Sequence, residues 1–307
     1  MKFILIIIST LLLLTACSSL PQSSAKPSSP TVALVLGGGG TLGFAHVGVL
    51  QALEQENIKP DLVVGTSAGA IVGSLYASGK SANELNQLAN LVSSADLLDF
   101  TARKSGVIQG IALRNFINTQ TDRTPIEKLP IRFIAVATQA NTGQAVAFSR
   151  GDTGQAVQAS ASVPKVFIAP IIDGVRYIDG ASSAVVPSRI ARQFGADVVI
   201  AVDLMSQEST IIPNSTIQQA SSLLSMLPIN TALTDKLKHI EKRILANPDD
   251  IKASDVVITP ALTTFSVVGA KDRQDIIQAG FIATKSQINA IKSAITHAKT
   301  KSQQPNP

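Results

Sequence analysis

The sequence predicts an α/β fold in which helices flank a mostly parallel central sheet, and two adjacent segments carry this prediction. An apolar run at 31–36 ends in four glycines and is followed by a helical pattern at 44–55. A second apolar run at 61–66 breaks at a serine between two glycines and continues as a helix rich in small residues. Two strands joined by a helix within so short a stretch form a right-handed crossover, which makes the strands parallel.

The composition is that of a folded chain with a large core. The 307 residues are 45% hydrophobic and 15% charged, which excludes a disordered protein. We expect one domain at 31–300, because no linker rich in proline, glycine or serine interrupts it, and a disordered tail at 301–307. The formal charge is +5, but the basic residues are scattered along the sequence. No nucleic-acid partner is therefore expected.

Ser67 lies in a Gly-x-Ser-x-Gly pattern at the end of the second predicted strand. In such a turn a strained backbone exposes the serine hydroxyl, and Gly65 and Gly69 avoid collisions with the neighbouring strand and helix. The unpaired amides at the start of the following helix favour negative charge beside Ser67. These are the requirements of an acyl-transfer nucleophile. A tight turn in which the serine only caps a helix fits the same five residues.

The glycine loop after the first strand is the predicted oxyanion site. Gly38, Gly39 and Gly40 leave backbone amides uncovered at the carboxyl edge of the sheet, beside the place where Ser67 emerges. The spacing of Gly38, Gly40 and Gly43 also fits a dinucleotide-binding fingerprint, but that motif requires an acidic residue after the second strand. This chain has the serine turn there, so no cofactor is expected.

Histidines and metal ligands are sparse. After Ser67 only His239 and His297 remain, and both lie in segments predicted to be solvated helices, which argues against a catalytic triad. His46, in the helix after the glycine loop, either supports that loop through a hydrogen bond or serves only in packing. No cluster with the spacing of metal ligands is visible, so no metal is expected.

A carboxylate is predicted at the same sheet edge. Tyr177 and Ile178 have the pattern of a strand end, and Asp179 and Gly180 that of the loop beyond it. This arrangement places Asp179 at the edge where Ser67 also emerges. An ordinary Asp-Gly turn is the alternative, since both residues favour turns for conformational reasons.

Taken in order, the glycine loop, the Gly-Thr-Ser67-Ala-Gly turn and the Asp179-Gly-Ala sequence resemble the patatin-like phospholipase family. The run Ala-Ser-x-Ser-x-Pro-x-x-Phe-x-x-Pro at 159–170 is also similar to that family, and the resemblance covers 31–203. It implies a three-layer α/β/α patatin-like fold and a Ser67–Asp179 dyad without a histidine. It also implies no cofactor and the hydrolysis of acyl esters in phospholipids or lysophospholipids.

This sequence departs from the family pattern at Leu42, where the glycine loop of the family usually carries Arg or Lys. If that cation braces the loop, replacing Leu42 by Arg should leave turnover unchanged or raise it. The family also commonly has Asn and Pro where this chain has Ala184 and Val185. Two alternatives to a hydrolase remain: a non-catalytic lipid-binding envelope lipoprotein, and an acyltransferase that uses the same dyad.

The first 16 residues resemble the signal peptide of a bacterial lipoprotein. Lys2 supplies a positive start, and the apolar run that follows is shorter than the roughly 20 residues that span a bilayer. The resemblance implies that Cys17 is lipidated and that 17–30 is a flexible tether. By resemblance to Gram-negative lipoproteins, Ser18 after the cysteine favours sorting to the outer membrane. We therefore expect a lipid anchor in the cell envelope, at the periplasmic face of the outer membrane, and we leave protein partners open.

The remaining segments give local expectations. We expect helices over 81–122, a strand at 131–138 that pairs with 144–148, a short helix at 153–161 and a long helix at 271–300. Residues 204–250 fit either a mobile lid that touches lipid or an ordinary packed helical pair.

Overall fold

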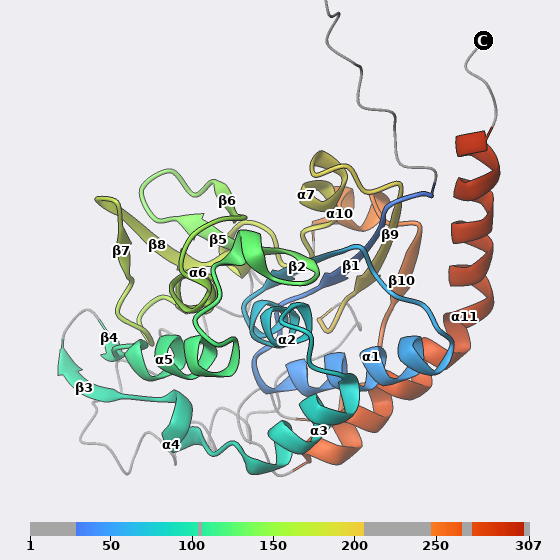
Figure 1. Cartoon of the computed structure of the whole chain (residues 1–307). Helices are drawn as coiled ribbons and strands as arrows, with labels where there is room; N and C mark the ends of the chain where they lie inside the picture. Colours follow the sequence, from blue (N-terminus) through green and yellow to red (C-terminus); the bar gives the residue numbers. More distant parts are fainter. Residues whose placement is uncertain (1–28, 104–105, 206–246, 266–271, 304–307) are drawn as a thin grey trace, which may run out of the picture.

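The computed structural model describes residues 29–103, 106–205, 247–265 and 272–303. Cys17, the predicted signal peptide and nearly all of the tether lie outside the described residues, and so does most of the segment 204–250. Figure 1 shows a central sheet with helices on both of its faces. The predicted α/β fold is therefore confirmed.

Within the described chain the main sheet has eight strands in the order β10-β9-β1-β2-β5-β8-β7, with β6 also paired to β5. The strands are β1 (Val32–Leu36), β2 (Leu62–Thr66), β5 (Arg132–Gln139), β6 (Ala145–Phe148), β7 (Ile171–Ile172), β8 (Val175–Asp179), β9 (Val198–Val202) and β10 (Val256–Ile258). The pairs from β10 through β5 are parallel, whereas β6, β7 and β8 join antiparallel. The carboxyl ends of β1 and β2 therefore lie side by side, as predicted.

Helices form the two outer layers, and the alternation of side chains along β1 shows how they divide. The helices are α1 (Ala45–Gln55), α2 (Ala68–Ala77), α3 (Ala82–Leu91), α4 (Ser94–Leu97), α5 (Ile111–Gln120), α6 (Thr153–Ser160), α7 (Ser188–Gln193), α10 (Pro248–Lys252) and α11 (Arg273–Gln303). Leu34 and Leu36 belong to the cluster shared with α1, α2 and α11, whereas Ala33 and Val35 belong to the one shared with α7. Successive strand residues point to opposite faces. This gives the three layers.

The α1 and α11 helices cross closely enough to require glycine. A Cβ atom on Gly48 would lie 1.8 Å from the carbonyl oxygen of Ile277, and one on Gly280 would lie 2.0 Å from that of Ala45. No side chain fits at such distances without moving a backbone. The long helix predicted at 271–300 is confirmed as α11, which contacts the segment that carries the glycine loop. It continues to Gln303, so the expectation of a disordered tail is wrong for 301–303.

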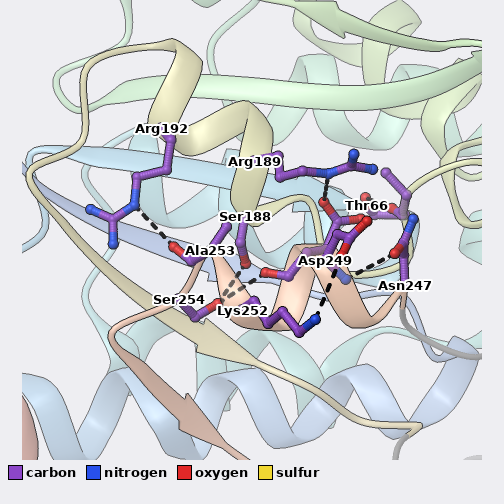
Figure 2. A network of polar contacts seen from close by, with 11 residues as sticks. Thr66, Ser188, Arg189, Arg192, Asn247, Asp249, Lys252, Ala253 and Ser254 are labelled. Carbon is purple, nitrogen blue, oxygen red and sulfur yellow. Dashed lines mark hydrogen bonds and ion pairs between the residues drawn. The ribbon is translucent and has the colours of Figure 1, made fainter.

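Polar contacts fasten α10 to α7, the helix that follows the Asp179 loop (Figure 2). Arg189 donates to the buried carboxylate of Asp250 at 2.7 Å, and Arg192 donates to the carbonyl of Ala253 at 2.9 Å. Both interactions join residues about sixty positions apart. They hold α7, and with it the chain beyond Asp179, in place beside α10.

The local expectations mostly hold. The strand at 131–138 and its partner at 144–148 are confirmed as β5 and β6, and the short helix at 153–161 as α6. The expectation of helices over 81–122 is wrong at one point, because β3 (Phe100–Arg103) and β4 (Gly106–Ile108) form a hairpin between α4 and α5. Its β4 strand contacts Phe167, a distant partner that no local pattern reveals.

None of the described helices combines the length and the apolar character that crossing a bilayer requires.

Candidate active site

Ser67 occupies a strained turn between β2 and α2. Its backbone angles are φ 54° and ψ −117°, a combination that non-glycine residues rarely adopt and that costs about 1–3 kcal/mol. A Cβ atom on Gly69 would lie 2.0 Å from the carbonyl oxygen of Leu36, and one on Gly65 would lie 2.4 Å from that of Gly69. The predicted need for glycine on both sides of Ser67 is therefore confirmed.

Asp179 is the last residue of β8, and its carboxylate contacts the serine. The Ser67 hydroxyl donates to Oδ2 of Asp179 at 2.7 Å, and the Ala181 amide donates to Oδ1 at 2.8 Å. The backbone of Asp179 is also held, because its N–H donates to the Ser162 carbonyl and its own carbonyl accepts from the Thr138 hydroxyl. Both oxygens and the main chain of Asp179 therefore have fixed partners.

Burial changes the chemistry of this carboxylate. Ser67 is 8% exposed and Asp179 is 3% exposed, so the expectation of an exposed serine is wrong. Loss of hydration raises the pKa of Asp179 from 3.8 to about 6, against the lowering effect of the hydrogen bonds from Ser67 and Ala181. A carboxylate with this pKa is a better proton acceptor than an aspartate in water, yet it is still ionised at neutral pH. The pair fits a nucleophile with its general base.

The glycine loop lies against the nucleophile, but its three predicted donors are not equivalent. A Cβ atom on Gly38 would lie 3.6 Å from the Cβ of Ser67. The Gly38 amide donates to the Val185 carbonyl at 3.0 Å, so our assignment of Gly38 as an oxyanion donor is wrong. Within the described residues no acceptor is found for the amides of Gly39 and Gly40. These two remain as candidate oxyanion donors.

His46 supports this loop through a hydrogen bond. It is fully buried, and its Nε2 lies 2.8 Å from the Gly37 carbonyl oxygen. A carbonyl only accepts, so Nε2 carries the proton. Its Nδ1 has no hydrogen-bond partner in the described part of the chain. Burial lowers the pKa of His46 to about 4, so the ring is neutral at neutral pH. Of the two roles left open by the sequence, the structure shows the hydrogen-bonding one.

Leu42 is part of the core. Its side chain is 1% exposed and belongs to the apolar cluster beneath the glycine loop. A cation at this position would have to enter that cluster or leave it by moving the loop. This reverses our expectation that arginine at position 42 leaves turnover unchanged or raises it.

Of the two histidines that follow Ser67 in the sequence, only one is described, and it takes no part in the site. His297 is exposed on α11, whereas His239 lies outside the described residues. The described part of the chain contains no group of three or more His, Cys, Asp or Glu side chains placed to hold a metal ion. One contact of the site was not predicted from the sequence. The Ser67 amide donates to the Ser160 hydroxyl. The motif at 159–170 was its only sequence signal.

The chain is similar in sequence to known proteins. The chain is 34% identical over 188 residues to an uncharacterized NTE family protein of Mycobacterium tuberculosis, covering 59% of this chain and 51% of that protein. It is 35% identical over 189 residues to human patatin-like phospholipase domain-containing protein 6, covering 59% of this chain and 14% of that protein. It thus spans about half the length of the mycobacterial relative and a small part of the human one.

The fold has a counterpart among solved structures. VipD from Legionella pneumophila superposes with a TM-score of 0.57 at 14% identity, covering 87% of this chain and 68% of that one. A family model described as patatin-like phospholipase matches residues 34–192. That stretch contains the glycine loop, Ser67 and Asp179, and it is more than half of the chain. The chain therefore belongs to the patatin-like phospholipase family.

Proposed function

We propose that this protein is a serine acyl hydrolase that cleaves ester bonds of phospholipids or lysophospholipids through Ser67 and Asp179. One observation carries the proposal: the 2.7 Å hydrogen bond from the Ser67 hydroxyl to the buried Asp179 carboxylate. Membership of a family described as phospholipases supports a lipid ester as the substrate. A serine that only capped a helix would need neither the strained turn nor the buried base.

Acylation requires a proton acceptor and donors for the oxyanion. The Ser67 oxygen attacks the ester carbonyl carbon while its proton passes to Oδ2 of Asp179. The amides of Gly39 and Gly40 then donate to the carbonyl oxygen as it becomes negative, and one such donor is worth about 2.7–4 kcal/mol of the barrier. When the tetrahedral intermediate collapses, Asp179 returns its proton to the leaving alcohol. The acyl group remains on Ser67.

Deacylation uses the same groups in reverse. Asp179 takes a proton from water, and the resulting hydroxide attacks the acyl carbonyl carbon. The bond to the Ser67 oxygen breaks, and that oxygen regains the proton from Asp179. An alcohol in place of water would turn the second step into acyl transfer, so the acceptor decides between hydrolase and acyltransferase.

Product analysis tests the proposal. The purified full chain is incubated with vesicles of phosphatidylcholine and with lysophosphatidylcholine, and the released fatty acid is measured by mass spectrometry. We expect fatty acid from the wild type and from the control variant Ser78→Ala. Ser78 lies at the C-terminal end of α2, the helix that follows Ser67, and its hydroxyl donates to the Leu75 carbonyl. Ser67→Ala should release none. A folded wild type that releases none, alongside an active control lipase, would favour the non-catalytic lipid-binding alternative.

An added acyl acceptor separates the two reaction classes. With a lysolipid or a long-chain alcohol in the assay, a hydrolase continues to release free fatty acid. An acyltransferase forms the new ester instead.

The pH dependence of the reaction should follow Asp179. The carboxylate must be ionised to accept the serine proton, and its pKa is raised to about 6. We expect kcat/KM to fall about tenfold per pH unit below that value and to level off above it. A pH–rate profile with a soluble ester measures this. An acid limb at about pH 4, which is the pKa of an exposed aspartate, would contradict the buried base.

Membrane attachment through Cys17 is also a proposal, supported by the sequence alone, and it would place the enzyme at the periplasmic face of the outer membrane. Growth with a labelled fatty acid should label the wild type and leave Cys17→Ser unlabelled and unprocessed. Equal label in both forms would exclude this anchor.

A further inference from the structure

The end of α6 contacts the nucleophile through a side chain. Ser160, the last residue of that helix, is fully buried. Its hydroxyl oxygen accepts from the Ser67 amide at 2.9 Å and donates to the Val136 carbonyl at 2.6 Å. Val136 lies directly opposite Thr66 in the sheet. The Ser160 hydroxyl thus bridges the backbone of β5 to the backbone of the nucleophile.

The same segment holds the base through its main chain. The Ser162 carbonyl accepts the amide of Asp179 at 2.8 Å. The Ser162 hydroxyl, equally buried, donates only within its own segment, to the Gln158 carbonyl at 2.6 Å. The main-chain carbonyl that accepts from Asp179 stays in place when the side chain at 162 is replaced, and the Ser162 side chain contacts neither member of the dyad. The Ser160 hydroxyl, by contrast, is a side-chain contact to the nucleophile that substitution can remove.

We propose that Ser160 is a positioning residue, whose hydroxyl holds the strained Ser67 peptide where the Ser67 oxygen reaches Asp179. The inference rests on the proposed function. The Ser67 amide lies at the N-terminus of α2, where the helix offers it no acceptor. Without the Ser160 hydroxyl, this buried amide would have no hydrogen-bond partner. A peptide released from that acceptor rotates toward relaxed backbone angles and carries the side chain away from the base.

The direction of the two hydrogen bonds excludes a role in proton transfer. The Val136 carbonyl can only accept, so the Ser160 proton points to it and a lone pair faces the Ser67 amide. This arrangement also commits the Ser67 amide, which cannot donate to an oxyanion. Stabilisation of that charge is left to other amides, those of the glycine loop and those at the start of α2.

Matched serine variants test the inference. We measure kcat and KM for p-nitrophenyl butyrate, with heat unfolding, for wild type, Ser160→Ala, Ser160→Cys and Ser162→Ala. Each alanine variant removes one buried hydroxyl from the same segment. We expect kcat of Ser160→Ala to fall about 10- to 100-fold with KM unchanged, the scale that a misplacement near 1 Å produces. Ser162→Ala should keep the wild-type kcat.

Two further readouts separate positioning from general destabilisation. Ser160→Cys keeps the volume but offers only a weak acceptor, so it should lose kcat even if the alanine variant does not fold. The hydrogen bond from Ser67 lowers the pKa of Asp179, so its loss should move the acid limb of the pH profile upward.

The outcomes distinguish this inference from the function on which it rests. A fall in kcat confined to the Ser160 variants supports it. Wild-type kcat in folded Ser160→Ala or Ser160→Cys overturns it alone, and so does an equal fall in Ser162→Ala. An inactive wild type overturns the proposed function together with the inference.

Discussion

Replacing Asp179 by asparagine should lower kcat for ester hydrolysis by about 10²- to 10⁴-fold, the usual contribution of a positioned general base. The amide has nearly the same shape, so its oxygen can still accept the Ala181 N–H that now binds Oδ1. It cannot take the Ser67 proton. Labelling of Ser67 by a fluorophosphonate probe should slow in parallel, because the probe needs the same activated hydroxyl.

The same substitution should make the protein more stable at neutral pH. The ionised carboxylate is unfavourable in the fold, because its pKa is about 6 against an ordinary 3.8. This cost is absent below pH 3.8, grows as the pH rises through about 6 and is constant above that. At 1.36 kcal/mol per pKa unit it amounts to about 3 kcal/mol, which Asp179→Asn removes. Activity and stability then move in opposite directions.

A matched variant completes this experiment. Asp173→Asn removes the same charge in the exposed turn between β7 and β8, where φ is 49° and asparagine is well tolerated. It should retain wild-type kcat and stability. An Asp179→Asn enzyme with nearly wild-type kcat would show that Asp179 is not the base. A large loss of stability would show instead that the carboxylate supports the fold.

Replacing Leu42 by arginine should lower the free energy of unfolding by about 3–5 kcal/mol, the scale of an unpaired charge left in a core. The side chain is 1% exposed and lies in an apolar cluster. If the charge escapes by displacing the loop, the amides of Gly39 and Gly40 move and turnover falls. Urea unfolding and ester hydrolysis measure the two effects.

Leu42→Met is the control for this prediction. It conserves volume and apolar character, so it should cost less than about 1.5 kcal/mol and preserve turnover. If Leu42→Arg were as stable as the wild type and at least as active, arginine would have to leave the core without disturbing the loop. The original expectation from the sequence would then stand, and the packing argument would fail.

The sequence by itself determined the elements whose causes are local. The strand, turn and helix around Ser67 follow from an apolar run, two glycines and small residues within about fifteen positions. The β5–β6 hairpin and the long α11 helix likewise show their own periodicity and turn residues. In each case neighbours in sequence supply the interactions that set the backbone conformation.

The pairing of Ser67 with Asp179 was predicted only in part from the residues themselves. Asp179 and Gly180 also fit an ordinary turn, and the dyad was predicted from the family resemblance. The contact joins residues 112 positions apart, so it exists only because β5 and β8 bring the Asp179 loop beside the turn after β2.

Only the tertiary structure decided which polar groups of the site are occupied. The Gly38 amide is taken by Val185, and the Ser67 amide by Ser160, 93 residues away. Leu42 faces the core rather than solvent. A buried backbone donor is satisfied by whatever distant segment packs against it. Local patterns therefore place the nucleophile, but the long-range packing of the chain determines which amides remain free to stabilise charge.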